Sequence, residues 1–132
     1  MKFKHDRDKE NFLMLHPLVI MIFSDLNWYA RLHHNIDLTV TDTISTPERD
    51  AALGRVSLSH QRGLAIDIRT KDMPMHVAKD LERYINHKKE YFKYKYLSRT
   101  GARRLAYLHG HGEEQHIHLA IHARFKDDSL GL

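Results

Sequence analysis

The stretch Ser59-His60-Gln61-Arg62-Gly63-Leu64-Ala65-Ile66-Asp67-Ile68 decides the fold. From Leu64 onward, apolar residues recur at every second position, as they do in a β-strand with one buried face. Asp67 lies on the opposite face of that strand, and His60 lies in the turn that leads into it. Because Gly63 permits backbone conformations that a side chain would block, the turn can curl back and bring His60 and Asp67 to one point. An imidazole and a carboxylate that meet in this way suit a zinc ion.

A second stretch near the C-terminus supplies further histidines: Gly110-His111-Gly112-Glu113-Glu114-Gln115-His116-Ile117-His118-Leu119-Ala120-Ile121-His122. Its residues alternate strictly from His116 onward, so His116 and His118 share one face of a strand and the large apolar residues share the other. A catalytic zinc ion usually has three protein ligands and an open position. His60, Asp67 and one histidine of this pair would supply three ligands, and the spacing leaves open which histidine it is.

Each of these residues has an ordinary structural explanation when it is taken alone. A single histidine such as His60 is more often a turn residue than a metal ligand, and most of the 12 histidines are expected to be surface or structural residues. Asp67 is less ordinary, because aspartate is depleted in strands. The two motifs together therefore indicate a metal site.

The motif His60-x-x-Gly63-x-Ala65-x-Asp67-Ile68, followed far downstream by a glutamate and His-Ile-His, resembles the zinc peptidases of the D-Ala-D-Ala carboxypeptidase and L-alanyl-D-glutamate endopeptidase group. That group includes many phage endolysins, and the His-Ile-His end is also similar to the hedgehog signalling domain, which shares the fold. The resemblance covers roughly residues 15 to 123. It implies Zn²⁺ as the cofactor and His118 as the third ligand, with His116 beside the metal as a catalytic group. The reverse assignment of the two histidines stays open.

The resemblance also implies a general base near the metal. A peptidase of this kind needs a group that takes a proton from water and passes it to the leaving amine. Glu113 fits the pattern Glu-x-x-His when it is counted to His116, whereas Glu114 shares the strand parity of His116. Both glutamates therefore stay candidates for the base.

Substrate-binding arginines follow from the resemblance less directly. In the related peptidases this region often carries a strand that ends in an arginine, and Ser45 stands at that position here. Arg49 or Arg55 is expected to substitute for it and to contact the substrate. Arg62 is expected to be an exposed residue without a catalytic role.

Length and composition fit one soluble globular domain. The chain has 132 residues, of which 42% are hydrophobic and 29% charged, and this suffices for a hydrophobic core. It has no cysteine, so neither a disulfide framework nor a thiolate zinc site is possible. The net charge of +4 favours polyanionic partners, either a bacterial cell wall or nucleic acid. Nucleic acid is the less favoured partner, because it leaves the two histidine motifs unexplained.

The sequence also leads to an expected location. The longest apolar run, Leu18 to Phe23, is too short to span a membrane. The segment Met1 to Glu10 is charged and has no apolar core, so it does not resemble a secretory signal. We therefore expect a cytoplasmic protein that reaches the cell wall through lysis or as a component of a phage virion or tail.

The remaining pattern predicts an α+β fold. Pro17 and the apolar residues after it indicate a helix over about 17–31, and a second helix is expected over about 74–90. Strands are expected over 38–41, 64–69, 105–109 and 116–123, residues 92–96 also suit a strand, and a helical turn is expected near Pro47. The strands should form a single antiparallel sheet with helices on one face and the zinc cleft on the other, as in hedgehog and D-Ala-D-Ala peptidase folds. A charged lead-in over 1–14 and a tail over 124–132 flank this single domain.

These observations lead to one expected function and one rival. The expected function is that of a phage-encoded zinc metallopeptidase, a carboxypeptidase or endopeptidase that hydrolyses a peptide bond in peptidoglycan stem peptides. The residues alone imply metal-assisted hydrolysis, and the resemblance implies the substrate. The rival is a non-catalytic zinc-containing binding or structural module of the same fold. The presence of Glu113 and Glu114 favours the enzyme, because a structural site needs no base.

Overall fold

A mixed five-stranded sheet carries the fold within residues 1–98 and 100–126, the part of the chain that the computed structural model describes. Its strand order is β1-β2-β3-β7-β6, with β1 (Lys2–Phe3), β2 (Thr39–Asp42), β3 (Ala65–Arg69), β7 (His116–Ala120) and β6 (Ala106–His109). β1 runs parallel to β2, and the other neighbouring pairs are antiparallel. A second sheet in the same described part pairs β4 (Tyr96–Leu97) with β5 (Arg103–Arg104).

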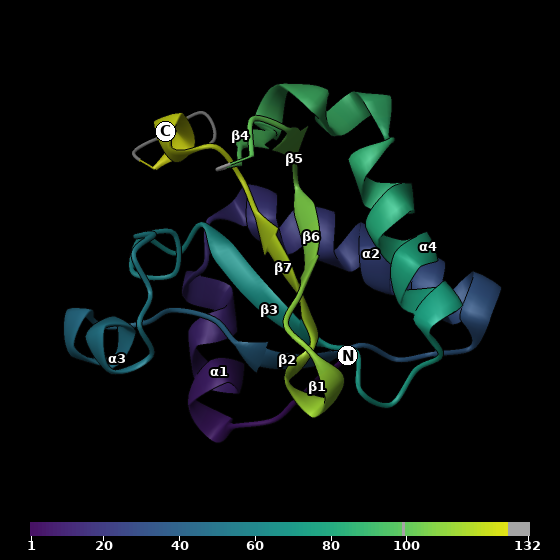
Figure 1. Cartoon of the computed structure of the whole chain (residues 1–132), viewed down its shortest axis with the longest axis horizontal. Coiled ribbons are helices and arrows are strands. Elements are labelled where there is room, and N and C mark those ends of the chain that lie inside the picture. Colours follow the sequence, from purple (N-terminus) through teal and green to yellow (C-terminus); the bar gives the residue numbers. More distant parts are fainter. Residues whose placement is uncertain (99, 127–132) are drawn as a thin grey trace.

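Helices connect these strands. The α-helices are α1 (Asp6–Asn11), α2 (Pro17–His34), α3 (Pro47–Ala52) and α4 (Met75–Asn86). Short 3-10 helices occur at η1 (Phe12–Met14), η2 (Lys89–Tyr94), η3 (Gly112–Glu114) and η4 (Ala123–Phe125). Figure 1 shows α2 passing behind the sheet and α4 beside α2 on the β6 side, whereas α3 lies on the opposite side of the molecule from α4.

The hydrophobic core lies between the sheet and the helices α2 and α4. Its largest fully buried side chains include Ile22, Phe23 and Leu26 of α2, Leu81 and Ile85 of α4, Ile66 and Ile68 of β3, and Ile117 and Leu119 of β7. Successive side chains of a strand point to opposite faces. The residues between these apolar positions, among them Asp67 and His118, therefore face away from the two helices.

Local signals explain the bounds of α2. Pro17 occupies its first position, and the backbone N–H of Leu18 donates to His16 Nδ1 at 3.1 Å. The helix ends where Asn35 adopts the left-handed conformation, with a φ of 53°. The predicted helix over 17–31 is confirmed, and it extends to His34.

The α+β class is confirmed, whereas the sheet differs from the predicted single antiparallel sheet. β1 adds a parallel strand at one edge, and β4 and β5 form a sheet of their own. Most of the segment 92–96, which suits a strand by alternation, belongs to the 3-10 helix η2. The reason is tertiary packing: the Tyr91 hydroxyl donates to Asp25 on α2, and the Tyr94 ring packs edge-on against Phe125.

The N-terminal segment also differs from the predicted charged lead-in over 1–14. Its residues form β1, α1 and η1, and Asp8 within α1 is buried. Thr43 Oγ1 donates to Asp8 Oδ1 at 2.7 Å, which anchors the segment to the chain just after β2. At the other end, η4 forms the start of the predicted tail, and residues 127–132 lie outside the described residues.

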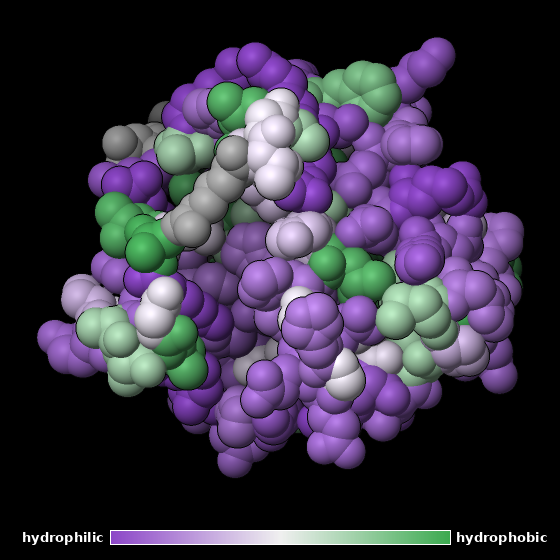
Figure 2. Space-filling model, in the orientation of Figure 1, coloured by the Kyte–Doolittle hydropathy of each residue, from purple (hydrophilic) through white to green (hydrophobic). Residues whose placement is uncertain are grey.

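Among the described residues, no single helix is both long and apolar enough to cross a membrane. One sharply bent pair, Asp6–Met14 with Pro17–His34, meets that criterion only when its two parts are taken together. Figure 2 shows that the face seen in Figure 1 is mainly hydrophilic and carries several separate hydrophobic patches.

Candidate metal centre

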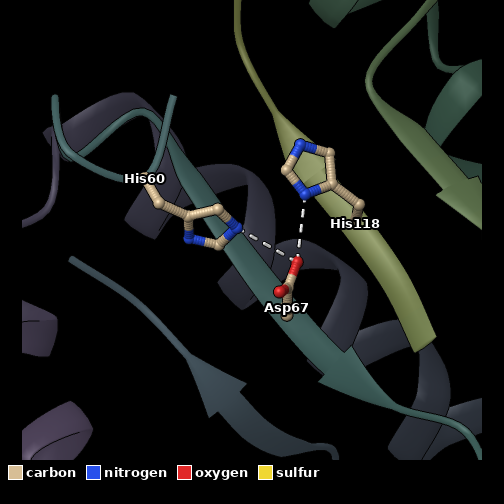
Figure 3. Close-up of side chains that lie close together, drawn as sticks. All are labelled: His60, Asp67 and His118. Atoms are coloured by element: carbon tan, nitrogen blue, oxygen red, sulfur yellow. Dashed lines mark hydrogen bonds and ion pairs between the residues drawn. The ribbon is translucent and has the colours of Figure 1, made fainter. Parts of the chain in front are cut away.

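Three side chains from different parts of the chain meet beside the sheet: His60, Asp67 and His118 (Figure 3). One possible ligand atom of each lies within 4.8 Å of the other two. The three residues that the sequence predicted as ligands are thus brought together, and the group could hold a metal ion.

Strand register brings Asp67 and His118 together. β3 and β7 are antiparallel neighbours, and Asp67 lies directly opposite His118 in their register. Side chains of directly opposite residues on neighbouring strands share one face of the sheet. The two residues therefore meet on the face that points away from α2 and α4.

The turn before β3 delivers His60 to the same point. Gly63 has a φ of +70°, a left-handed conformation that glycine adopts without steric strain. Its backbone N–H donates to the His60 carbonyl at 3.2 Å, and the N–H of Leu64 donates to the Ser59 carbonyl at 2.9 Å. The turn curls back as predicted, and His60, which is only 3% exposed, points at Asp67 (Figure 3).

A backbone hydrogen bond orients the His60 ring. Its Nδ1–H donates to the carbonyl oxygen of Thr43 at 2.7 Å, so the lone pair of the neutral ring is on Nε2. Nε2 is buried, has no hydrogen-bond partner among the described residues and lies 3.3 Å from Asp67 Oδ1. Metal-binding histidines typically donate their other N–H to a carbonyl or carboxylate in this way. An Nε2 that makes no hydrogen bond among the described residues and faces the Asp67 carboxylate therefore fits a metal ligand.

The carboxylate of Asp67 lies at the middle of the centre, close to His60, His116 and His118. Its Oδ1 lies 3.0 Å from His118 Nδ1 and 3.9 Å from His116 Nε2. Burial acts to raise the pKa of Asp67, but the neighbouring His60 and His118 hold that pKa well below its usual range. Burial likewise acts to lower the pKa of His60, but the charge of Asp67 raises it overall. The ionised carboxylate thus attracts a positive charge to this point, and either a proton or a metal ion supplies it.

Two arginines connect the centre to further buried carboxylates. Arg55 donates to Asp42, and to Asp50 and Asp67 at 3.2 Å each. Arg49 donates to Asp42 at 2.5 Å. Because Asp42 and Asp50 are buried, these ion pairs give both guanidinium groups a structural role. The expected contact of Arg49 and Arg55 with a substrate stays a prediction.

His116 lies at the edge of the centre, whereas the two glutamates lie outside it. His116 Nδ1–H donates to the Glu114 carbonyl at 3.0 Å, which leaves the lone pair of the neutral ring on Nε2, the nitrogen nearer to Asp67. Glu113 and Glu114 lie in η3 and are exposed. Neither carboxylate forms a hydrogen bond or ion pair with another residue that the structure describes. Their role as a base stays a prediction.

Sequence reasoning missed two contributors to the centre. Thr43 acts through its backbone carbonyl, so its residue type gives no signal. Asp42 was missed because the predicted strand ends at Thr41, whereas β2 extends to Asp42. Had the strand been extended by one residue, Asp42 would have given the same signal as Asp67, an aspartate in a strand.

Comparisons with protein-family models, with curated proteins and with solved structures gave no match.

Proposed function

We propose that this protein is a zinc-dependent peptidase that hydrolyses a peptide bond in bacterial peptidoglycan stem peptides. The observation that carries the proposal is the buried Nε2 of His60, which lacks a hydrogen-bond partner among the described residues and lies beside Asp67. With His118, the set comprises two imidazoles and one carboxylate. Catalytic zinc sites use three such protein ligands and leave a further position open. The chain contains no cysteine, so thiolate ligands play no part.

The chain's own residues prepare this site for the metal. Zinc, when bound, supplies a Lewis acid that lowers the pKa of water and polarises a carbonyl oxygen. The low pKa of Asp67 keeps its carboxylate ionised at neutral pH. The Thr43 carbonyl turns His60 Nε2 toward Asp67, and Arg55 holds the second carboxylate oxygen. These contacts fix the ligand atoms in place, as the hydrogen bonds around metal ligands commonly do.

Peptide hydrolysis also requires a group that moves a proton from water to the leaving amine. We assign this role to His116, because the Glu114 carbonyl holds its Nδ1 and its Nε2 faces the centre, 3.9 Å from Asp67 Oδ1. Its side chain is 26% exposed, so a substrate can reach it. Glu113 and Glu114 are the alternative bases, and each would have to turn inward from its exposed position in η3.

The substrate class and the phage context of this proposal come from the motif resemblance, since the residues alone specify metal-assisted hydrolysis. The net charge of +4 suits an enzyme that acts on an anionic cell wall. On this proposal the protein is made in the cytoplasm and meets the wall after lysis or as part of a virion or tail.

The second candidate is a non-catalytic zinc-containing module. One observation favours it: the carboxylates expected to act as the base, Glu113 and Glu114, form no hydrogen bond or ion pair with His60, Asp67 or His118. Zinc would then hold the turn before β3 against β3 and β7, and the cleft would bind a partner without cleaving it.

Digestion of purified peptidoglycan, followed by mass spectrometry of the released peptides, separates the two candidates. The zinc-loaded protein should release peptides, a chelator should abolish release, and added zinc should restore it. The masses identify the bond that is cut. A zinc-loaded protein that releases no peptide would instead be the binding module.

A further inference from the structure

A groove opens beside the metal centre, and His118 forms part of its wall. Its cavity volume is about 200 Å³, below the roughly 300–1,000 Å³ of pockets that hold drug-sized ligands. The large apolar side chains of its lining are Leu58, Leu64, Leu97 and Ile121. The groove therefore suits a small group, about the size of one or two amino-acid residues, next to the metal.

Arg62 brings a positive charge into this groove. It lies two residues after His60 in the turn before β3, and its side chain is part of the described lining. Its guanidinium forms no hydrogen bond or ion pair with any residue that the structure describes, unlike those of Arg49 and Arg55. No aspartate or glutamate lines the described groove either. Among the described lining residues, Arg62 thus carries a charge that calls for a counter-ion.

We propose that Arg62 binds a carboxylate of the ligand while the apolar wall holds the adjoining residue. A guanidinium matches a carboxylate through two parallel hydrogen bonds. Because Arg62 is exposed, the gain in affinity is modest, and the two parallel hydrogen bonds mainly give selectivity for a carboxylate. The inference deepens the proposed peptidase function, on which it rests, by naming the ligand class: a short peptide with a carboxylate next to a small apolar group.

The test compares three small ligands on the purified protein by NMR titration of backbone amide shifts. They are N-acetyl-alanine, its neutral amide, and the α-amide of N-acetyl-glutamate, whose carboxylate is on the side chain. At least one acid should bind about threefold or more tightly than the neutral amide, because an ion pair with an exposed guanidinium contributes up to roughly 1 kcal/mol.

Two variants that each remove one positive charge show whether Arg62 causes the preference for the acid over the amide. Arg62→Gln should remove the preference for the acid. Arg7→Gln removes the same charge from an exposed position on α1 and should keep that preference. Equal binding of acids and amide by the parent overturns the proposal. So does an undiminished preference in Arg62→Gln, which would assign the carboxylate to the metal instead.

The order of the two acids identifies the source of the carboxylate. Tighter binding of N-acetyl-alanine supports a terminal carboxylate and hence a carboxypeptidase. Tighter binding of the glutamate derivative supports a side-chain carboxylate and hence an endopeptidase.

The role of Arg62 in binding and the peptidase function can be refuted independently of each other. A protein that cleaves peptidoglycan but binds acid and amide equally refutes the role of Arg62 and keeps the peptidase function. A protein that prefers the acid through Arg62 but releases no peptide refutes the peptidase function and keeps the carboxylate site.

Discussion

The two ring nitrogens of His60 have different surroundings. Nδ1 donates to a backbone carbonyl, whereas Nε2 is buried without a hydrogen-bond partner among the described residues. A buried polar atom that lacks a partner costs roughly 1–3 kcal/mol of stability. A cation between His60 and Asp67 removes that cost, so metal binding and folding of the turn before β3 should be coupled.

Single substitutions can separate the three candidate bases. His116→Ala should lower turnover on peptidoglycan by at least about 100-fold, because a positioned base typically contributes that much or more. Glu113→Gln and Glu114→Gln should stay near the parent rate, as should His111→Ala, an exposed control in the same segment. A large loss in one glutamate variant, with His116→Ala still active, would assign the base to that glutamate.

Arg55 contacts three buried carboxylates, those of Asp42, Asp50 and Asp67. Arg55→Gln removes the guanidinium that these carboxylates share, so the free energy of unfolding should fall by about 2–4 kcal/mol in chemical denaturation. Arg69→Gln is the control, because it loses only a 3.5 Å contact with an exposed aspartate and should change stability by less than about 0.5 kcal/mol. Equal stability of the two variants would contradict this role of Arg55.

The candidate ligands could be predicted in part because their signals are local. His60 and Asp67 belong to one turn and strand, and strand alternation puts both His116 and His118 on one face. The choice of His118 between these two followed from the motif resemblance. The surrounding ion pairs could not be predicted in the same way. Arg55 reaches Asp67 through the fold of the loop after α3, and no periodic pattern specifies that path.

The turn between β6 and β7 sets the position of His116. Gly110 has a φ of +89°, and a Cβ there would lie 2.9 Å from the carbonyl oxygen of Glu114. That carbonyl is the one to which His116 Nδ1–H donates. The backbone of this short connection therefore orients the His116 ring.

Gly110→Ala should consequently impair function more than folding. Gly101→Ala is the matched control, since Gly101 has the same φ of +89° but open space around its Cβ position. Gly101→Ala should lose about 1–2 kcal/mol of stability, because side chains disfavour this conformation. Gly110→Ala should lose somewhat more, because its Cβ also meets the Glu114 carbonyl. Only Gly110→Ala should also lose turnover, by about 10- to 100-fold, since small displacements of catalytic groups are costly. Equal turnover of the two variants in peptidoglycan digestion would contradict the argument.

Secondary structure was predictable where one local pattern dominates. Helix α2 follows from the spacing of its apolar residues and from Pro17 at its start. The segment of η2 has the alternation of a strand, but Tyr91 turns inward to reach Asp25, and this tertiary contact overrides the local preference. The charged residues of α1 conceal a buried aspartate, which composition cannot reveal.

Two carboxylates connect helix α2 to α4 and to η2. Asp25 on α2 accepts hydrogen bonds from Tyr84 and Lys88 and from Tyr91 of η2. Asp80 on α4 accepts from Tyr29 and bonds His34 of α2. Burial acts to raise the pKa of Asp25, but its three donors lower it overall. The hydrogen bond from Tyr29 lowers the pKa of Asp80.

The whole molecule should therefore lose stability in acid. Because both folded pKa values lie below the usual 3.8, the carboxylates contribute fully above that pH and lose their contribution as the pH falls through the folded values. Urea denaturation of the metal-free protein should show this decline. Asp25→Asn should lower stability at pH 7 by about 2 kcal/mol and flatten the decline, since hydrogen bonds to charged groups have that strength. Asp72→Asn, at an exposed position, should change neither, and an unchanged acid profile in Asp25→Asn would contradict the argument.

The zinc content of the purified protein, measured by elemental analysis, is the sharpest test of the metal centre. About one zinc ion per chain is expected in the parent, in His116→Ala and in the exposed control His76→Ala. Essentially no zinc is expected in His60→Ala, Asp67→Ala and His118→Ala, because each of these removes one of the three candidate ligands. A parent that binds no zinc, or full zinc occupancy in any of the three ligand variants, would contradict the metal centre.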